Sequence, residues 1–317
     1  MIRAWHADGA VAREVPPDEA VRLGVSGPGA VWIDLDCVEP EEALELLGPF
    51  HFHPLALEDM VTQINRPKVD DYGEYLYLAV HSARWEEDEP SLREIDLIIG
   101  QRVLVSYHDG ASRATTAVHD FLPRRPELLS RGPSHLVHVM LDVLVDNYFP
   151  IMDKIAAEID GLEEEMFRPS AKDVNERILR LKRGMSSVRR IIGPQRDTIL
   201  ALTRDEFAAI PAEMRPYLRD VYDRLARVGD LIESFRDETA TLLELQVAMT
   251  SNRLNEVIKT LTVIATIMFP LTLVSSYYGM NFDFVEYHWK YGWAYVLGLL
   301  AATAGATWWY LRSNRWL

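Results

Sequence analysis

Two stretches near the C-terminus contain no formally charged side chain. They cover residues 260–278 (TLTVIATIMFPLTLVSSYY) and 291–311 (YGWAYVLGLLAATAGATWWYL), which are 19 and 21 residues long. A helix rises ~1.5 Å per residue, so ~20 residues cross a ~30 Å hydrocarbon layer. Aromatic residues cluster at the ends of both stretches, where amphipathic rings favour the membrane–water interface. The pattern predicts two transmembrane helices, and the alternative is a pair of helices buried in a large soluble domain.

From residue 134 the apolar positions follow a helical period. Leu136–Phe167 and Asp173–Leu202 are predicted helices, separated at Arg168-Pro169-Ser170. A third helix begins near Pro216 and meets no stop signal before Tyr278. Its apolar residues alternate in steps of three and four, which is typical of a coiled-coil seam. The seam positions are Leu218, Val221, Leu225, Val228, Ile232, Phe235, Thr239, Leu242, Gln246 and Met249. We expect copies of this helix, ~90 Å long at ~60 residues, to pack as a parallel homo-oligomer around one axis.

Residues 1 to 133 have a mixed pattern. Segments 31–36, 74–85 and 94–109 are rich in β-branched and aromatic residues and are predicted as strands, the last of them as a pair. Residues 39–47 and 54–60 are predicted as short helices that open with proline and acidic residues. The fold class that follows is an N-terminal α/β domain, then long stalk helices, then two C-terminal transmembrane helices.

These patterns predict five parts of the chain. They are a cytoplasmic α/β domain (1–133), long cytoplasmic helices with the first part of the stalk (134–253), the stalk end and first transmembrane helix (254–280), an external loop (281–290), and a second transmembrane helix with a short basic tail (291–317).

Charge is distributed unevenly between these parts. The chain of 317 residues has a formal net charge of −15, yet residues 255–317 hold four basic and three acidic residues, which leaves −16 for residues 1–254. An acidic body argues against nucleic acid as a partner. Basic residues flank the outer ends of the two spans, and only Lys290 lies in the loop between them, so both termini are expected in the cytoplasm and the protein in the plasma (inner) membrane. Met1–Pro16 lacks the apolar run of a signal peptide.

The composition excludes several other kinds of chemistry. Cys37 is the one cysteine, so neither a disulfide framework nor a multi-cysteine metal motif is possible within the chain. No phosphate-binding glycine loop and no nucleophile elbow is present, so we expect neither an enzyme nor an organic cofactor. His51 with His53, and His135 with His138, have spacings that could ligate a metal, although such pairs are more often ordinary surface or packing residues.

One side of the first span carries a polar, then apolar, then polar stripe. It comprises Asn255, Ile258, Leu261 or Thr262, Ala265, Phe269, Thr272 and Ser276. Apolar rings can gate a pore by dewetting, and hydroxyl or amide rings can hold hydrated ions. Ordinary helix–helix packing explains the apolar members equally well. Just beyond the span, Gly279 can end the helix and Asn281 offers an amide acceptor, which suits recognition of a hydrated Mg²⁺.

The run YGMNF (278–282) after the first of two C-terminal spans resembles the signature of the CorA family of magnesium and cobalt transporters. The resemblance extends over nearly the whole chain. It includes HPLALEDM (53–60), NRPKVD (65–70), 144–167, RDVYD (219–223), 251–272 and the final Arg315-Trp316-Leu317.

The resemblance implies a funnel-shaped homopentamer whose stalk helix continues into the pore. By position, Gly279, Met280 and Asn281 match the selectivity filter. Asn255 matches a polar ring at the inner mouth, and Ile258, Leu261, Ala265 and Phe269 match the hydrophobic constriction. Regulatory Mg²⁺ is expected between subunits at Asp59 and Asp220, with Glu58 as a weaker candidate.

Three departures from the family pattern are visible. The loop DFVEYHWK (283–290) is about one residue short, Phe269 replaces a frequent Met, and the tail has two arginines. The function implied is a passive Mg²⁺ channel that also accepts Co²⁺ and Ni²⁺ and is gated by cytoplasmic Mg²⁺. Its partners are then the bilayer, divalent cations and copies of itself. The alternatives are a zinc transporter of the same superfamily and a non-conducting membrane-anchored signalling protein.

Overall fold

The structure is a computed structural model, and it describes residues 1–9, 11–63, 65–86, 89–110, 112–167, 174–204, 207–281, 284–314 and 316. The predicted break at 168–170, residues 282–283 of the predicted motif and loop, and Arg315 and Leu317 of the tail lie outside the described residues. The chain divides into two compact units, residues 1–242 and 243–317. Each unit is described by itself.

The first unit contains a seven-stranded sheet in the order β2-β1-β3-β7-β6-β5-β4. Only β3 and β7 pair in parallel, and the other neighbours are antiparallel. The strands are β1 (Ile2–Asp8), β2 (Val11–Glu14), β3 (Ala30–Asp36), β4 (Lys68–Asp71), β5 (Tyr75–Glu86), β6 (Glu89–Gly100) and β7 (Val103–His108). The strands predicted at 31–36, 74–85 and 94–109 are confirmed as β3, β5 and the β6–β7 pair. Strand β1 and the short outer strands β2 and β4 were not predicted, and none of the three has a long apolar run.

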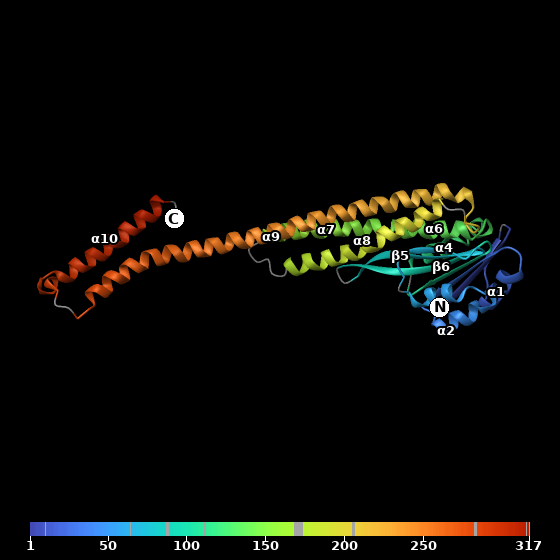
Figure 1. Ribbon diagram of the computed structural model, residues 1–317, viewed down its shortest axis with the longest axis horizontal. Helices are drawn as coiled ribbons and strands as arrows, with labels where there is room; N and C mark the ends of the chain where they lie inside the picture. The colour runs from blue at the N-terminus through green and yellow to red at the C-terminus, as the bar shows by residue number, and fades with distance from the viewer. Residues whose placement is uncertain are drawn as a thin grey trace. The chain divides into compact units, whose positions relative to one another are not determined.

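Helices cover both faces of this sheet (Figure 1). The helices and 3₁₀ turns before the stalk are α1 (Pro17–Ser26), α2 (Pro40–Leu47), η1 (Gly48–Phe50), α3 (Pro54–Thr62), α4 (Arg113–Phe121), α5 (Glu127–Ser130), α6 (Pro133–Asp146), α7 (Tyr148–Met166), α8 (Val174–Arg204) and η2 (Ala212–Met214). On one face, α1, α2 and α3 bury a core with side chains of the central strands, including Ile33, Ile98 and Val105. Helices α4, α6, α7 and α8 lie on the opposite face.

The predicted single helix over Leu136–Phe167 is wrong, because the structure has two helices there. Helix α6 ends at Asp146 and α7 begins at Tyr148, with Asn147 between them. Pro150 explains the break: it has no N–H to donate to the carbonyl of Asp146, and its ring would crowd that carbonyl in a continuous helix. A proline in the first turn of a helix is tolerated, so α7 starts normally.

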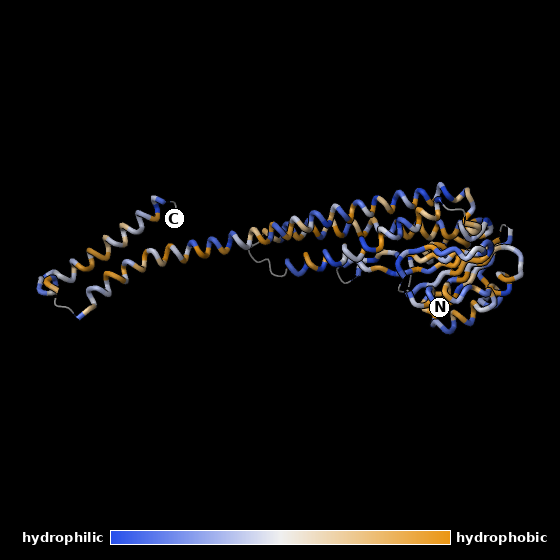
Figure 2. The backbone as a smooth tube through the Cα atoms, in the orientation of Figure 1, coloured by the Kyte–Doolittle hydropathy of each residue, from blue (hydrophilic) through white to orange (hydrophobic). Residues whose placement is uncertain are grey.

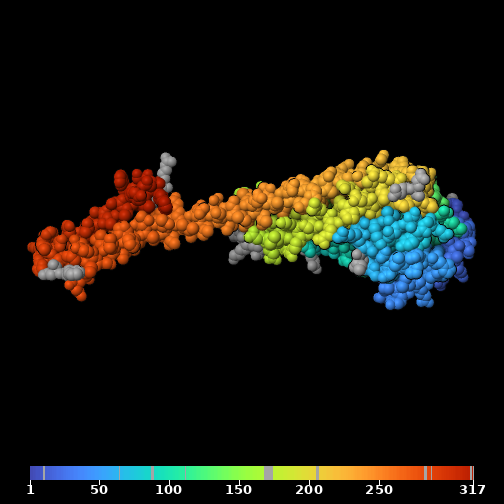
Figure 3. Space-filling view, viewed as in Figure 1, coloured from blue at the N-terminus to red at the C-terminus, as the bar shows by residue number. Residues whose placement is uncertain are grey.

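Helix α9 (Arg215–Tyr278) matches the predicted third helix and contributes residues to both units. In the first unit its seam is buried within this one chain, at Leu218, Val221, Leu225, Val228, Ile232, Thr239 and Leu242. Helix α8 supplies part of the cover, because Ile192 lies against Gly229. Figure 3 shows α8 and the first part of α9 running side by side at the surface. The expectation that the seam as a whole requires copies of itself is therefore wrong for positions 218–242, since neighbouring helices already bury them.

The second unit contains the end of α9, the turn η3 (Val285–His288) and helix α10 (Gly292–Ser313). Both helices are long and apolar enough to cross a membrane, and Figure 2 shows that apolar and weakly polar residues dominate them in this part of the chain. Almost none of their most apolar segments is buried in the protein. Exposed apolar surface of this extent needs a lipid or protein cover.

Candidate functional site

Gly279 lies directly after the last residue of α9 and closes the helix. Its N–H donates to the carbonyls of Ser275 at 3.0 Å and Ser276 at 3.2 Å. Its backbone is not in the left-handed region, so conformational freedom is not the reason for a glycine. A Cβ at this position would lie 3.2 Å from the carbonyl oxygen of Ser275, a tight contact that a shift of a few tenths of an ångström would relieve. Met280 and Asn281 follow with exposed side chains.

Aromatic rings support this end of α9. The ring of Phe284 lies 5.0 Å from that of Tyr277 and 5.4 Å from that of Tyr278, measured between centroids. At the start of α10, Gly292 is required, since a Cβ there would lie 1.9 Å from the carbonyl oxygen of Glu286. The segment that carries the predicted filter is thus held on both sides by close packing.

The predicted pore stripe is exposed along its whole length. Asn255, Ile258, Leu261, Ala265, Phe269, Thr272 and Ser276 are all exposed, and the exposed fraction reaches 75% at Phe269. Residues of the same chain approach its first members, Asn255 and Ile258. The rest of the stripe, from Leu261 to Ser276, is available to a neighbouring helix or a water-filled path.

A different face of the same segment is partly covered. Its members are Thr262, Val263, Thr266, Ile267, Pro270, Leu271, Val274 and Tyr278. At about 100° per residue this face lies roughly opposite the pore stripe. Helix α10 also has a partly covered face, formed by Val296, Leu299, Leu300, Thr303, Ala304 and Thr307, with Leu311 buried at its end. Of the two alternatives at the stripe, Leu261 is therefore the exposed residue and Thr262 belongs to the covered face.

Residues from both ends of the second unit line a groove of about 280 Å³. Asn255, Ile258, Lys259 and Thr262 come from α9, and Asn314 and Trp316 follow α10. The groove shows that the residues after α10 reach the beginning of the apolar segment of α9.

Asp59, a predicted cation ligand, lies near the end of α3. Its carboxylate pairs with Lys68 Nζ at 2.5 Å, and Lys68 also contacts Asp70 at 2.9 Å. Burial opposes the charged form of Lys68, but the hydrogen bonds to Asp59 and Asp70 raise the pKa of Lys68. The neighbouring Glu58 is exposed.

Asp220, the second predicted ligand, lies near the start of α9. Its side chain is 69% exposed and pairs with Arg224 at 3.2 Å. Arg224 also pairs with Asp142 and with Asp146 of α6. Among the described residues of this protomer, no group of three or more His, Cys, Asp or Glu side chains could hold a metal ion. Asp59 and Asp220 have separate ion-pair partners within the chain, Lys68 and Arg224.

The two histidine pairs have other partners. His53 caps α3 by accepting the N–H of Leu55 at 3.2 Å, and His51 is exposed in a left-handed backbone conformation. His135 lies 4.0 Å from Glu213, and the ring of His138 contacts that of Tyr217. Burial lowers the pKa of both His135 and His138. The pairs are explained by capping and packing.

A buried network around Asp34 was not anticipated from the sequence. Asp34 accepts from Ser106 at 2.5 Å and contacts His119 Nε2 at 2.7 Å and His108 Nε2 at 3.2 Å. Burial alone would raise the pKa of Asp34, but the hydrogen bonds from His108 and His119 lower it to about 2. The network joins β3, β7 and α4, so it supports the fold.

A second unanticipated cluster lies on β5 and β6. Asp96 is fully buried, its Oδ1 accepts from Tyr77 at 2.5 Å, and its Oδ2 has no hydrogen-bond partner among the described residues. Burial and the neighbouring charge of Glu94 raise the pKa of Asp96 to about 9. Burial also raises the pKa of Glu94. In the sequence, nothing distinguishes Glu94 and Asp96 from other acidic residues, so this cluster was not predicted.

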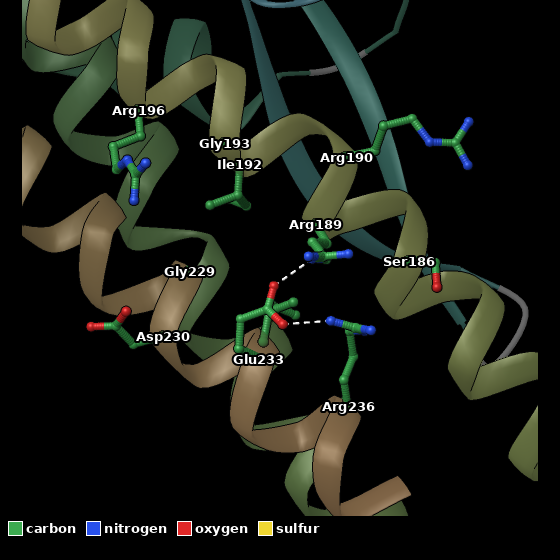
Figure 4. A pocket seen from close by; sticks show the side chains of 11 residues that line it. Ser186, Arg189, Arg190, Ile192, Gly193, Arg196, Gly229, Asp230, Glu233 and Arg236 are labelled. Carbon is green, nitrogen blue, oxygen red and sulfur yellow. Dashed lines mark hydrogen bonds and ion pairs between the residues drawn. The ribbon is translucent and has the colours of Figure 1, made fainter. Parts of the chain in front are cut away.

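Arginine side chains line a surface groove of about 590 Å³ between α8 and α9. Figure 4 shows Arg189 and Arg236 each paired with a different carboxylate oxygen of Glu233. Arg190 points away from this pair. Glu233 bridges the two central guanidinium groups, so the groove contains an ion-paired contact between α8 and α9.

Comparison with known proteins connects these features. Residues 28–313 match the model of a family described as CorA-like Mg²⁺ transporter protein. The cobalt/magnesium transport protein CorA of Thermotoga maritima is 32% identical over 291 residues, covering 90% of this chain and 83% of that protein. The zinc transport protein ZntB of Cronobacter sakazakii is 24% identical over 323 residues, covering 100% of this chain and 96% of that protein.

A solved structure has the same fold over the full length. The structure of the CorA magnesium transporter from Methanocaldococcus jannaschii matches with a TM-score of 0.88 at 18% identity, covering 100% of this chain and 99% of that one. The fold of both units, including the long helix and the C-terminal apolar helix, is thus shared with that structure.

Proposed function

The chain belongs to the CorA-like Mg²⁺ transporter family, and on that premise we propose that it is a passive channel for Mg²⁺ that also accepts Co²⁺ and Ni²⁺. As a member of this family it is a membrane protein for divalent-cation transport. The observation that supports a conducting path is the exposed stripe of α9, which lies opposite the face covered within the second unit and leads to Gly279-Met280-Asn281.

The path would be formed by several copies of α9, and a homopentamer is the assembly we propose. Exposed Ile258, Leu261 and Phe269 then form apolar rings, which close a pore when water leaves them. Thr272 and Ser276 place hydroxyl groups on the outer side of these rings, and Asn255 places an amide on the inner side. The sequence carries no phosphate-binding glycine loop that could couple transport to ATP, so movement is proposed to follow the electrochemical gradient.

Asn281 and the backbone at Gly279 and Met280 are proposed to recognise the cation at the outer mouth. Mg²⁺ dehydrates reluctantly, so neutral acceptors that hydrogen-bond its water shell select it at little cost. Asn281 is exposed, and the packing of Phe284 against Tyr277 and Tyr278 keeps the start of this segment in place.

Regulation is proposed at Asp59 and Asp220, with Glu58 as a further acidic side chain. Carboxylate oxygens are the ligands that Mg²⁺ prefers. Carboxylates of adjoining subunits repel one another unless a cation lies between them, so cation binding at this contact would favour the closed packing by mass action. Both termini are proposed to lie in the cytoplasm of a cell whose inner membrane holds the two spans.

Zinc transport is the second candidate. The full-length similarity to ZntB supports it, although the higher identity to a cobalt/magnesium transport protein favours magnesium. Flux of Mg²⁺, Co²⁺ and Zn²⁺ in competition, into proteoliposomes holding the full chain, distinguishes these ions. Absence of uptake of every divalent cation would overturn the channel and favour the non-conducting signalling protein.

Asp220→Lys tests the regulatory part of the proposal. The variant should weaken the protection of the stalk from protease by Mg²⁺, because a lysine ammonium repels a cation at this contact. Unchanged protection would count against a regulatory role for Asp220.

A further inference from the structure

We propose that Lys68 occupies the regulatory cation site within each subunit, and that Asp70 is a further ligand of this site. The inference rests on the proposed regulatory role of Asp59. Lys68 Nζ lies between the carboxylates of Asp59 and Asp70, at 2.5 Å and 2.9 Å. Its ammonium group therefore has the position that a small cation shared by the two carboxylates would have.

The location of the site suits a cation shared with a neighbouring subunit. Strand β4, which carries Lys68 and Asp70, is the edge strand of the sheet. The two residues are two positions apart, so their side chains emerge on the same face of the strand. Asp59 reaches this face from α3, and all three side chains remain partly exposed, at 32% for Lys68 and Asp59 and 42% for Asp70.

The backbone around Asp59 is held from inside the domain. Asn65 Nδ2 donates to the carbonyl of Asp59 at 2.8 Å and to Glu94 Oε1 at 2.9 Å. The N–H of Asn65 also donates to Glu94, at 3.2 Å to Oε2. Asp59 lies in the last turn of α3, where carbonyls lack helical partners. Asn65 therefore caps the helix and ties the Asp59 segment to the buried Glu94.

Lys68 competes with a cation for the Asp59 carboxylate. Its ammonium group lies 5.1 Å from the ring centroid of Tyr77, and the two carboxylates raise its pKa, so it stays charged. A divalent cation at Asp59 has to displace this ammonium group from the carboxylate and then tolerate its repulsion nearby. Lys68 thereby raises the Mg²⁺ concentration at which the site is half-occupied.

The test uses the full chain in detergent and measures the Mg²⁺ concentration that half-protects the stalk from protease. Lys68→Gln should lower this midpoint by about five- to tenfold, because the competitor and its repulsion are removed. Asp70→Asn should raise the midpoint by about threefold or more, because one carboxylate ligand is lost. Lys68→Met keeps the apolar stem over Tyr77 and should give the same shift as Lys68→Gln.

Two exposed neighbours provide matched controls. Arg66→Gln removes the same charge two residues away from Lys68, and Glu74→Gln removes a carboxylate from the turn after β4. Both should leave the midpoint within about twofold, because screening weakens exposed charges at longer range. Shifts in the controls equal to those of the site variants would show a general charge effect and overturn the proposal.

Asp59→Asn distinguishes the role of Lys68 from the role of Asp59. If it abolishes protection while both Lys68 variants leave the midpoint unchanged or raise it, the role of Lys68 is overturned and that of Asp59 stands. If Asp59→Asn leaves protection unchanged, the regulatory role of Asp59 fails, and the inference fails with it.

Discussion

The side-chain amide of Gln195 pairs with the main chain of His81 as a neighbouring strand would. Gln195 Oε1 accepts the N–H of His81 at 2.7 Å, and Gln195 Nε2 donates to its carbonyl at 3.2 Å. Tyr148 donates to the same carbonyl at 2.8 Å. Strand β4 pairs with β5 only as far as Ala79, so His81 lies beyond its last strand partner on this side. One buried glutamine of α8 thus extends the sheet by a residue and attaches the helix to it.

Gln195→Ala should lower the stability of the first unit by about 1–3 kcal/mol, because a buried N–H and part of the carbonyl's bonding are left unsatisfied. Thermal unfolding of the full chain in detergent measures the loss. Gln101→Ala, at an exposed turn position, is the control and should leave the midpoint unchanged. Equal midpoints for the two variants would show that the pairing contributes no stability.

Asn281→Ala should reduce Mg²⁺ uptake into proteoliposomes by at least about tenfold, because the amide that binds the hydrated cation at the proposed filter is removed. Size-exclusion chromatography should show the same oligomer as for the unchanged chain. Asn175→Ala removes an exposed amide from α8 and should transport normally. Normal uptake by Asn281→Ala would refute the role of this residue.

Leu261→Ser should increase ion leak several-fold at high Mg²⁺, where the channel is proposed to be closed, because a hydroxyl ring keeps water in the constriction. Ile264→Ser introduces the same change at an exposed position outside the stripe and serves as control. Flux measured with Mg²⁺ on both sides reports the leak. A larger leak from Ile264→Ser would place the pore on another side of α9.

Asp96→Asn should stabilise the first unit more near pH 8 than near pH 5. The pKa of Asp96 is raised to about 9 in the fold, whereas an unfolded Asp titrates near ~3.9. Between these values the folded state binds the extra proton, so its stability falls as pH rises through this window. Asparagine mimics the protonated carboxyl and removes this dependence.

Thermal unfolding of Asp96→Asn and of the unchanged chain at pH 5, 6.5 and 8 measures the direction of this pH dependence of stability. The gain at pH 8 should exceed that at pH 5 by several kcal/mol, since the stability of the unchanged chain falls by ~1.4 kcal/mol for each pH unit inside this window. Glu74→Gln, at an exposed position, should show no such trend. A gain that is largest at pH 5 would contradict the raised pKa.

The local features of this protein were predictable because their signals lie in neighbouring residues. The two uncharged stretches correspond to the end of α9 and to α10. The absence of a stop signal predicted one helix from near Pro216 to Tyr278. The break at Asn147 was also encoded locally, by Pro150, although the apolar period across it suggested one helix.

The apolar pattern of α9 could not show which other helices bury each segment of this helix. Seam positions up to Leu242 are buried by helices of the same chain, although their spacing alone suits contacts between copies. Likewise, Leu261 and Thr262 are adjacent in sequence and equally compatible with the stripe, yet only Leu261 is exposed. Which positions are buried depends on where the other helices lie. The apolar period of a single helix carries no information about those positions.

The sequence by itself determined the two apolar spans, the long helix, the acidic body and the Gly279-Met280-Asn281 motif, because length, charge and short motifs are properties of consecutive residues. Only the tertiary structure decided that Lys68 lies between Asp59 and Asp70, and that Asp34 gathers His108 and His119. These contacts join residues from separate helices and strands, and the strength of each charge interaction depends on the distance and burial that the fold sets.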